Sequence, residues 1–286
     1  MALGNSMGIG IPMVNLGLGG GGGGAGFLLD DYPNIAGNSY SLRKLSANTT
    51  NVIRVRRSSD NAEQDFSASD ITDGTLATFC TGSNGFVVTW YDQTGSDDLK
   101  QPTALEQPKI VSEGGVILEN GKPCASFDGS NDSLFADLID QTRNGYQAFM
   151  VNAQTDTGSG SAQYVYTLTI DENNSFRTNY VPSISFVLRG KQDLSYTTPS
   201  SSTPQSLYYN NNTETGKGSK IFINGTNVAT GNVAGTFTKK VRLGDNGAGG
   251  TKHSAIKMQE FILYFSDIEN DVGDITENIN SYYSIY

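Results

Sequence analysis

Short runs of β-branched and aromatic residues recur along the chain from Phe27 onward, and turn-forming residues separate them. Clear examples are NVIRVRR (51–57), FVVTWYDQ (86–93) and AIKMQEFILYF (255–265). Two Asn-Gly pairs, at 120–121 and 224–225, lie between apolar runs, which is the strongest short-range signal of a β-hairpin. The number and spacing of these runs predict an all-β fold, an antiparallel β-sandwich or jelly roll, over residues 27–286.

Two segments carry helical signals. The stretch ASDITDGTLATFC (68–80) predicts a short helix. Near the end of the chain, four aliphatic residues recur at helical spacing and form one apolar face: Ile268, Val272, Ile275 and Ile279. Because Ser266 and Glu269 match a capping box, we expect an amphipathic helix over 267–282, packed on the sandwich.

The charge balance of the chain is acidic. The net charge is −10, and charged residues make up only 17% of the 286 residues. A nucleic-acid groove needs a basic field, so we expect no nucleic-acid partner. No apolar run approaches the roughly 18 residues of a membrane-spanning helix, so we expect no membrane partner.

Arg54, Arg56 and Arg57 form a basic cluster on one expected strand. Strand alternation places Arg54 and Arg56 on one face and Val55 on the other. We expect a solvated sheet face on which these arginines pair with the acidic residues that follow them: Asp60, Glu63 and Asp65.

Cysteine and histidine are scarce. Cys80 and Cys124 lack the spacing of metal ligands, and we expect two buried thiols, with a disulfide as the alternative in an oxidising compartment. The single histidine, His253, has no second histidine or nearby cysteine with which to hold zinc or build a catalytic triad. We therefore expect no metal and no cofactor.

The first 26 residues differ from the rest of the chain. Apolar residues alternate with glycines, and six glycines (19–24) follow without a break: the apolar residues are Met7, Ile9, Ile11, Met13, Val14, Leu16 and Leu18. The segment lacks the basic start and the continuous apolar core of a signal peptide. Disordered tails are usually polar, so we interpret residues 1–26 as an apolar docking arm that inserts into another subunit.

Several motifs occur in a fixed order: YSLRKL (40–45), IRVRRSSDNAEQDF (53–66), GFVVTWYDQTGSDDLKQ (85–101), QPKIV (107–111) and NGKPCASFDGSNDSL (120–134). Together they resemble the concanavalin A-like, LamG-type jelly-roll domain of many bacteriophage virion proteins. They are also similar to the catalytic domain of the arabinofuranosidase B family. The resemblance covers residues 27–286. It is specific for the fold and weak for activity, because such folds host lectins, adhesins and hydrolases alike.

The residues of these motifs suit structural roles. Trp90 and Tyr91 alternate on one strand, so only one of them can fill the core. Asp92 and Gln93 stand where that strand ends and can bond turn amides. The segment 128–132 (DGSND) offers oxygen ligands for calcium, but an Asp-Gly turn with side-chain caps is the more common use of such a sequence.

The arabinofuranosidase resemblance implies a catalytic pair. The family places its nucleophile in Glu-Asn-Asn and its general acid in Gly-Asp-Asn, which here match Glu172 and Asp245. A vicinal cysteine pair, the family's C-terminal sugar-binding domain and an export signal are not found in this sequence. We therefore expect no catalysis, with Glu172 on an exposed turn and Asp245 bonding the backbone of its own glycine-rich loop.

Three functions then compete: a structural or adhesive virion protein, an arabinofuranosidase-like hydrolase, and a soluble carbohydrate-binding module. The arm favours the first, because a virion subunit needs an anchor. We expect a homo-oligomer in the virion, made in the host cytoplasm without a signal peptide and joined to other virion proteins through the arm. A host surface glycan is a further expected partner, bound through exposed aromatic and amide side chains such as Tyr208, Tyr209 and Asn210.

Overall fold

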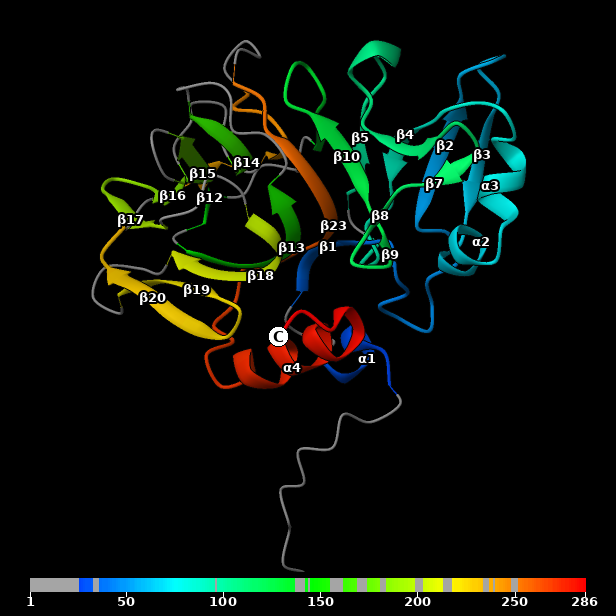
Figure 1. Ribbon diagram of the computed structural model, residues 1–286. Helices are drawn as coiled ribbons and strands as arrows, with labels where there is room; N and C mark the ends of the chain where they lie inside the picture. The colour runs from blue at the N-terminus through cyan, green and yellow to red at the C-terminus, as the bar shows by residue number, and fades with distance from the viewer. Residues whose placement is uncertain are drawn as a thin grey trace, which may run out of the picture.

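Antiparallel strands are the main secondary structure of the described residues (Figure 1). The computed structural model describes residues 26–32, 36–95, 97–136, 142–143, 145–154, 162–168, 174–180, 184–198, 203–212, 218–233, 237–238, 240–247 and 252–286. The predicted docking arm, from Met7 to Leu18, lies outside these residues. No helix in the described ranges is long and apolar enough to cross a membrane.

The first half of the chain contributes α1 (Leu28–Asp31), β1 (Ala36–Ser41), β2 (Ile53–Arg57), β3 (Glu63–Phe66), α2 (Ala68–Thr72), α3 (Thr75–Phe79), β4 (Gly85–Trp90), β5 (Leu99–Lys100), the 3-10 helix η1 (Ala104–Glu106), β6 (Lys109–Ser112), β7 (Gly115–Val116), β8 (Leu118–Glu119), β9 (Lys122–Pro123), β10 (Ala125–Asp128), β11 (Leu134–Ala136) and β12 (Thr142–Arg143).

The second half contributes β13 (Tyr146–Gln154), β14 (Gln163–Thr167), β15 (Ser175–Tyr180), β16 (Ile184–Arg189), β17 (Asp193–Thr197), β18 (Thr203–Asn212), β19 (Ser219–Ile223), β20 (Thr226–Gly231), β21 (Phe237–Thr238), β22 (Val241–Leu243), β23 (Ala255–Tyr264) and α4 (Val272–Tyr283).

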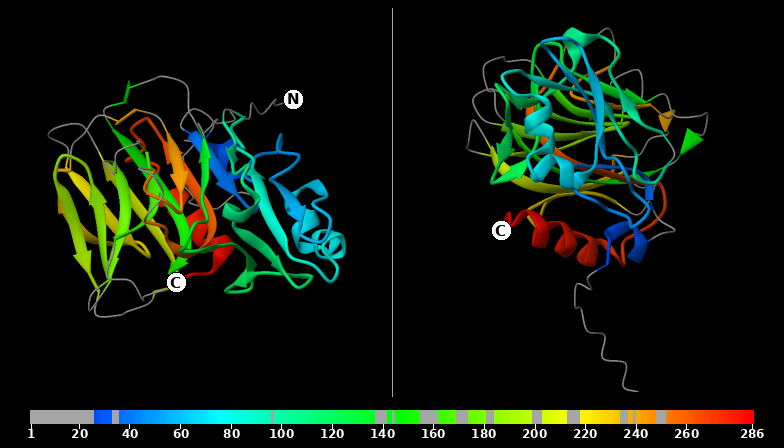
Figure 2. Two further views of the ribbon diagram at one scale, coloured as in Figure 1. Left: turned by 90° about the horizontal axis from the view of Figure 1, so that it is seen from above. Right: turned by 90° about the vertical axis from the view of Figure 1, so that its right-hand side faces the viewer.

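The strand ladder divides at β4. One edge of β4 pairs with β2, while the other pairs with β6 through Gly85 and Phe86 and with β5 through Thr89 and Trp90. From β6 the ladder runs on through β10, β23, β13, β18, β19 and β20. From β5 it runs on through β11, β22, β14, β15, β16 and β17. The result is a curled, jelly-roll-like antiparallel sheet with two layers (Figure 2), which confirms the predicted fold class.

A large apolar cluster fills the space between the layers. Trp90 is fully buried in it, whereas its neighbour Tyr91 is half-buried, as strand alternation predicts. Stacked and tilted rings continue the cluster toward the second half of the chain, with Phe176 against both Tyr166 and Phe186. Each fully buried large apolar side chain contributes about 1.5–3 kcal/mol, so this cluster is the main source of stability.

The C-terminal helix α4 covers the outer face of one layer (Figures 1 and 2). Ile268, Ile275 and Ile279 are buried there and Val272 is partly buried, in a second cluster with Phe149 and other residues of the sheet. The predicted apolar face is confirmed.

The predicted helix starts are less accurate. Helix α4 begins at Val272 after Asp271, and Ser266 and Glu269 form no capping box. A turn closed by a hydrogen bond from Asp271 N–H to Ile268 O precedes the helix. Ile268 lies in this turn and packs in the second cluster. The helix predicted over 68–80 is two helices, because Gly74 between them has a left-handed φ of 96°; beside it the Asp73 carboxylate accepts the Thr75 N–H at 2.9 Å.

Both predicted Asn-Gly hairpins are present. Asn120 and Gly121 have φ of 47° and 73°, and Asn224 and Gly225 have φ of 49° and 73°. Two successive residues with positive φ are typical of the type I′ turn, which matches the twist of the flanking strands. The first pair joins β8 to β9 and the second joins β19 to β20.

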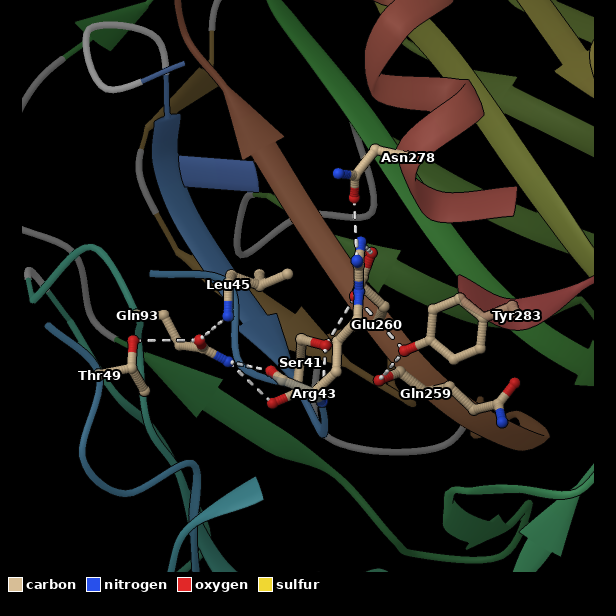
Figure 3. A network of polar contacts seen from close by, with 9 residues as sticks. All are labelled: Ser41, Arg43, Leu45, Thr49, Gln93, Gln259, Glu260, Asn278 and Tyr283. Carbon is tan, nitrogen blue, oxygen red and sulfur yellow. Dashed lines mark hydrogen bonds and ion pairs between the residues drawn. The ribbon is translucent and has the colours of Figure 1, made fainter. Parts of the chain in front are cut away.

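A buried polar network ties β1, β23 and α4 together (Figure 3). Arg43 forms an ion pair with Glu260 at 2.8 Å, and both side chains are buried. Arg43 also donates to Asn278 of α4 at 2.9 Å, and Tyr283 donates to Glu260 at 3.3 Å. Gln93 closes the network by donating to the backbone of Ser41 and Arg43.

Candidate functional site

A cavity of about 670 Å³ opens where the strand ladder divides. Strands β5 and β6 separate along the edge of β4, and the segments 101–108 and 129–133 cross between the layers at this point. Hydrogen bonds join the two segments, from Ser133 N–H to Glu106 O at 3.0 Å and from the Asn131 amide to Leu105 O at 3.0 Å. We call this space the fork cavity. Its lining includes Arg56, Phe86, Leu105, Gln107, Lys109 and Asp132.

Four strands present one row of side chains to the fork cavity. Arg56 of β2 pairs with Phe86 of β4, Phe86 pairs with Lys109 of β6, and Lys109 pairs with Ser126 of β10. Residues directly opposite each other on neighbouring strands have their side chains on the same face. Their neighbours Val55, Val87, Ile110 and Phe127 are buried in the core on the other face. The row therefore places a partly exposed phenylalanine between two cations on the face opposite the core.

Arg56 is held rigidly in this row. Its Nε donates to Gln107 at 2.8 Å, Nη1 to Asn61 at 2.9 Å and Nη2 to the Ala104 carbonyl at 3.0 Å. Its guanidinium lies 5.1 Å from the centre of the Phe86 ring. Arg56 is only 9% exposed, so the expectation that it pairs with an acidic residue on a solvated face is wrong. Arg56 has no acidic partner because loop 101–108 buries it and supplies neutral hydrogen-bond acceptors.

The other two arginines of the cluster behave as predicted. Arg54 pairs with Asp65 at 2.7 Å and with Glu63 at 3.9 Å, and Arg57 pairs with Asp60 at 2.7 Å. These three acidic partners are the ones that the sequence indicated. Both arginines are thereby neutralised locally, which leaves Arg56 as the arginine of this cluster that lines the fork cavity.

Lys109 contributes the second cation. Its ammonium lies 5.9 Å from the centre of the Phe86 ring, opposite Arg56 in the row. Within the described part of the chain, Lys109 has no hydrogen-bond or ion-pair partner. Leu105, 84% exposed, lines the same cavity and adds an apolar surface to it. The fork cavity thus combines an aromatic ring, an aliphatic side chain and an unpaired ammonium.

The FDGSND turn closes one side of the fork cavity. Asp128 accepts hydrogen bonds from the backbone N–H groups of Ser130, Asn131 and Asp132, and Asp132 accepts one from Asp128 N–H at 2.9 Å. The described residues contain no cluster of His, Cys, Asp and Glu that would hold a metal ion. These hydrogen bonds confirm the capped Asp-Gly turn that the sequence predicts.

Asp132 is the titratable group of this turn with an altered proton affinity. Its pKa is raised to about 7: burial is the largest cause and the charge of Asp128 adds to the rise, whereas the hydrogen bond from the Asp128 N–H and the charge of Lys109 oppose it. An acid with such a pKa exchanges its proton near neutral pH. Asp132 therefore carries less negative charge in the cavity than an ordinary aspartate does.

A second cavity, of about 440 Å³, lies beside the WYDQTG loop. Asp92 accepts from the N–H groups of Ser39, Thr94 and Asp97, and Gln93 accepts from Leu45 N–H. These bonds confirm that Asp92 and Gln93 cap turns. Because their polar atoms are occupied in holding the loop, this cavity offers fewer free groups to a ligand than the fork cavity.

The residues predicted to bind sugar are buried. Tyr208 is 1% exposed, Tyr209 is 5% exposed and Asn210 is fully buried. Strand β18 pairs with β13 on one edge and β19 on the other, so both faces are covered by the core and by α4. Asn210 accepts the Tyr166 hydroxyl at 2.5 Å. The prediction of an exposed binding surface at these three residues is wrong, because β18 is a central strand.

The two carboxylates of the hydrolase alternative are only partly described. Glu172 lies outside the described residues. Asp245 is buried, and it accepts Gly247 N–H at 2.9 Å and Arg242 at 3.3 Å. The predicted contact of Asp245 with the backbone of its own glycine-rich loop is confirmed.

Cys80 and Cys124 are both free and buried, as expected for structural thiols. Burial raises the pKa of Cys80, and it raises the pKa of Cys124 to about 12, so neither thiol forms a thiolate readily at neutral pH.

The row in the fork cavity was missed from sequence. Alternation misleads here, because it puts Phe86 on the same face as Trp90, four residues along the strand. A register shift between the pairs Arg54–Thr89 and Val55–Val87 brings Val87 and Trp90 into the core together and leaves Phe86 on the other face. The pairing of Phe86 with Arg56 and Lys109 depends on strand register, which the alternation of a single strand does not contain.

Comparison with known proteins supports the fold. No protein-family model matches the sequence, and no curated protein matches it. Among solved structures, a GH54 α-L-arabinofuranosidase soaked with a cyclic sulfate inhibitor is similar, with 11% identity and a TM-score of 0.64. An arabinofuranosidase complexed with arabinofuranosyl-α-1,2-xylobiose is also similar, with 11% identity and a TM-score of 0.58.

In both comparisons the alignment covers 88% of this chain and 64% of the other chain. The likeness shows that this chain shares the β-sandwich fold of these chains. At this identity it shows the fold alone, and the virion assignment stays a prediction.

Proposed function

We propose that this protein is a non-catalytic, saccharide-binding β-sandwich protein with an adhesive role, and that the fork cavity is its binding site. One observation carries the proposal: the Phe86 ring lies partly exposed in a cavity, between Arg56 and Lys109, on the face opposite the core. An aromatic ring gives a flat apolar surface for the C–H face of a sugar, and the flanking polar groups can bond its hydroxyls.

The rest of the cavity suits the same ligand. Gln107 and Arg56 are fixed by mutual hydrogen bonding, so they are preorganised and lose little entropy on binding. Leu105 supplies an exposed apolar contact beside the ring. The similarity in fold to arabinofuranosidases supports a saccharide over other ligands of this size.

The environment of Asp245 supports a binding role over hydrolysis. A retaining glycosidase needs two carboxylates about 5–5.5 Å apart and free to act on the glycosidic bond. Asp245 instead uses both oxygens internally, on Gly247 N–H and on Arg242. We expect no release of nitrophenol from an aryl arabinofuranoside, and turnover that is lost in Asp245→Asn would favour the hydrolase alternative.

The setting that we propose is a virion, in which residues 1–26 dock the protein to other subunits and the sandwich projects outward. The composition of the arm supports this, since an apolar segment on a glycine tether needs a partner surface. Homo-oligomerisation and a host surface glycan as ligand are parts of the same proposal.

The binding proposal is tested with an array of glycans, followed by calorimetry on the best ligand. Phe86→Ala removes the ring, and we expect at least about a tenfold loss of affinity, the size typical of one aromatic contact. Phe135→Ala is the matched control, because Phe135 also lies under a cation, Arg242 at 4.8 Å, but does not line the fork cavity.

Phe135→Ala is expected to bind as the wild type does. The absence of any saccharide ligand, or equal affinities of the two variants for one ligand, would overturn the proposal. Both variants are first checked for an unchanged thermal unfolding transition, so that a folding defect is not mistaken for lost binding.

A further inference from the structure

The geometry of the fork cavity points to a ligand class: we propose that it selects saccharides that carry a carboxylate, the uronic acids, over their neutral counterparts. This inference rests on the proposed function, because it names the ligand of the same site. It is argued from the charges that line the cavity and from the partners that each of them has.

Lys109 is the first element of the argument. Arg54, Arg57 and Lys257 each pair with an acidic side chain within 3.0 Å. Lys109 forms no salt bridge within the described residues: its ammonium lies 5.9 Å from the centre of the Phe86 ring, and its charge acts on the Asp132 carboxyl group, whose pKa is raised to about 7. An ammonium that lines a cavity without a hydrogen-bonded counter-ion is suited to an anionic ligand.

Arg56 is the second element. A guanidinium has five N–H groups, and three of those of Arg56 donate to Gln107, Asn61 and Ala104. All three partners are neutral acceptors, so the positive charge is not cancelled by a carboxylate. The remaining N–H groups and the uncompensated charge of a nearly buried arginine strengthen the attraction for a carboxylate inside the cavity.

The two acidic residues of the cavity wall, Asp128 and Asp132, repel a carboxylate ligand less strongly than two free, ionised carboxylates would. Asp128 is turned toward its own loop, where one oxygen accepts three backbone N–H groups. Asp132 accepts the Asp128 N–H, and burial raises its pKa to about 7. The wall therefore presents two cations, one internally bonded carboxylate and one carboxyl group of reduced charge.

The position of Phe86 completes the selection. Because Arg56 and Lys109 lie on its two sides in one row, a sugar that stacks on the ring has its ring substituents near a cation on either side. A uronic acid carries its carboxylate on the sugar ring, so stacking and charge pairing are met by one residue of the ligand. A neutral hexose in the same place keeps the stacking and loses the charge pairing.

The test compares matched ligands. An array presents glucuronides and galacturonides beside their carboxyl-reduced counterparts, and calorimetry then measures the strongest uronide against its reduced form. We expect the uronide to bind about 10–100 times more tightly, the range of a charge-assisted hydrogen bond. The preference should also fall as salt is raised, since exposed charges are screened.

Three variants locate the effect. Lys109→Gln should weaken binding of the uronide more than binding of the reduced sugar and so abolish most of the preference, and Lys109→Arg should retain it. Lys100→Gln is the matched control and should behave as the wild type, because Lys100 is 62% exposed and lies on β5, which pairs with the same edge of β4 as β6 does. Equal affinity for the two ligands, or equal effects of Lys109→Gln and Lys100→Gln, would overturn the inference.

Failure of the inference and failure of the proposed function are distinguishable. If neutral and acidic sugars bind equally and Phe86→Ala weakens both, the site is a saccharide site without charge selection. If no sugar binds, or if Phe86→Ala has no effect, the proposed function itself is wrong and the inference falls with it.

Discussion

Asp132, in the fork cavity, makes the stability of the folded protein depend on pH. Its carboxyl group is buried beneath the FDGSND turn and accepts the Asp128 N–H. An unfolded chain releases this proton near pH 3.8, whereas the folded protein holds it to about 7. Between these values the folded state binds more protons than the unfolded state, so this group makes the protein less stable as the pH rises.

We predict that Asp132→Asn gains stability relative to the wild type between about pH 4 and about pH 8, because the amide never ionises. The gain should reach on the order of 2 kcal/mol. Urea unfolding at several pH values measures it. Asp128→Asn should show an intermediate curve, since it removes only the neighbouring charge, and parallel curves for all three proteins would contradict the prediction.

At the residue scale the sequence predicted roles that depend on local spacing. Trp90 in the core, Asp92 as a cap and Asp245 on its own loop all follow from alternation or from the bonding habits of short polar side chains. Arg56 and Tyr208 could not be predicted in the same way. Whether such a side chain meets solvent depends on which loop or strand covers it, and that is decided by segments far away in the sequence.

At the scale of elements, the two type I′ hairpins allow the cost of adding a side chain at a turn residue with positive φ to be measured. Gly121 and Gly225 share a φ of 73°, which L-residues with a side chain rarely adopt. An added Cβ at Gly121 would meet nothing within 4 Å, whereas one at Gly225 would lie 3.0 Å from the Tyr286 hydroxyl. Alanine substitutions at these two glycines therefore separate the cost of backbone strain from the cost of side-chain crowding.

We predict that Gly121→Ala lowers the free energy of unfolding by about 1–2 kcal/mol through backbone strain alone. Gly225→Ala should cost nearly the same, because Tyr286 is 56% exposed and its ring can turn away. Chemical denaturation of the two variants, and of Gly225→Ala combined with Tyr286→Phe, measures the difference. A much larger cost at Gly225 that Tyr286→Phe does not relieve would show that the crowding argument is wrong.

The elements themselves were predicted better than their ends. Asn-Gly pairs specify a turn directly, and the spacing of Ile275 and Ile279 specifies a helical face. The start of α4 was misplaced because Ile268 continues the apolar spacing while belonging to a turn. The break between α2 and α3 was missed because it depends on the left-handed conformation of Gly74, and a glycine can also lie within a helix.

At the scale of the whole molecule, the two-layered sheet was predictable and the fork was not. Strand alternation indicates that two faces must be covered, and that implies a sandwich. The division of β4 between β5 and β6 is a long-range pairing, set by the segments 101–108 and 129–133 that cross there. The fork cavity exists because of that pairing, so the candidate site could not be found before the fold.

The docking arm yields a prediction at this scale. Deletion of residues 1–25 should leave the thermal unfolding transition of the sandwich unchanged and abolish incorporation into the particle. A full-length variant with Ile9, Ile11, Leu16 and Leu18 changed to Ser is the matched control, because it keeps the tether and removes the apolar groups. It should fail to incorporate as well. Normal stoichiometry of either variant in the particle would contradict the docking proposal.

Strand β23 has a consequence for how the protein is made. It pairs with β1 and β10 on one edge and with β13 on the other, so it lies at the centre of its layer. It follows all three of these partners in the chain, at Ala255–Tyr264. The ribosome therefore makes β1, β10 and β13 before the strand that they share, and their edges that face β23 have no partner until β23 is made. In that interval we expect these edges to be open to edge-to-edge association between nascent chains.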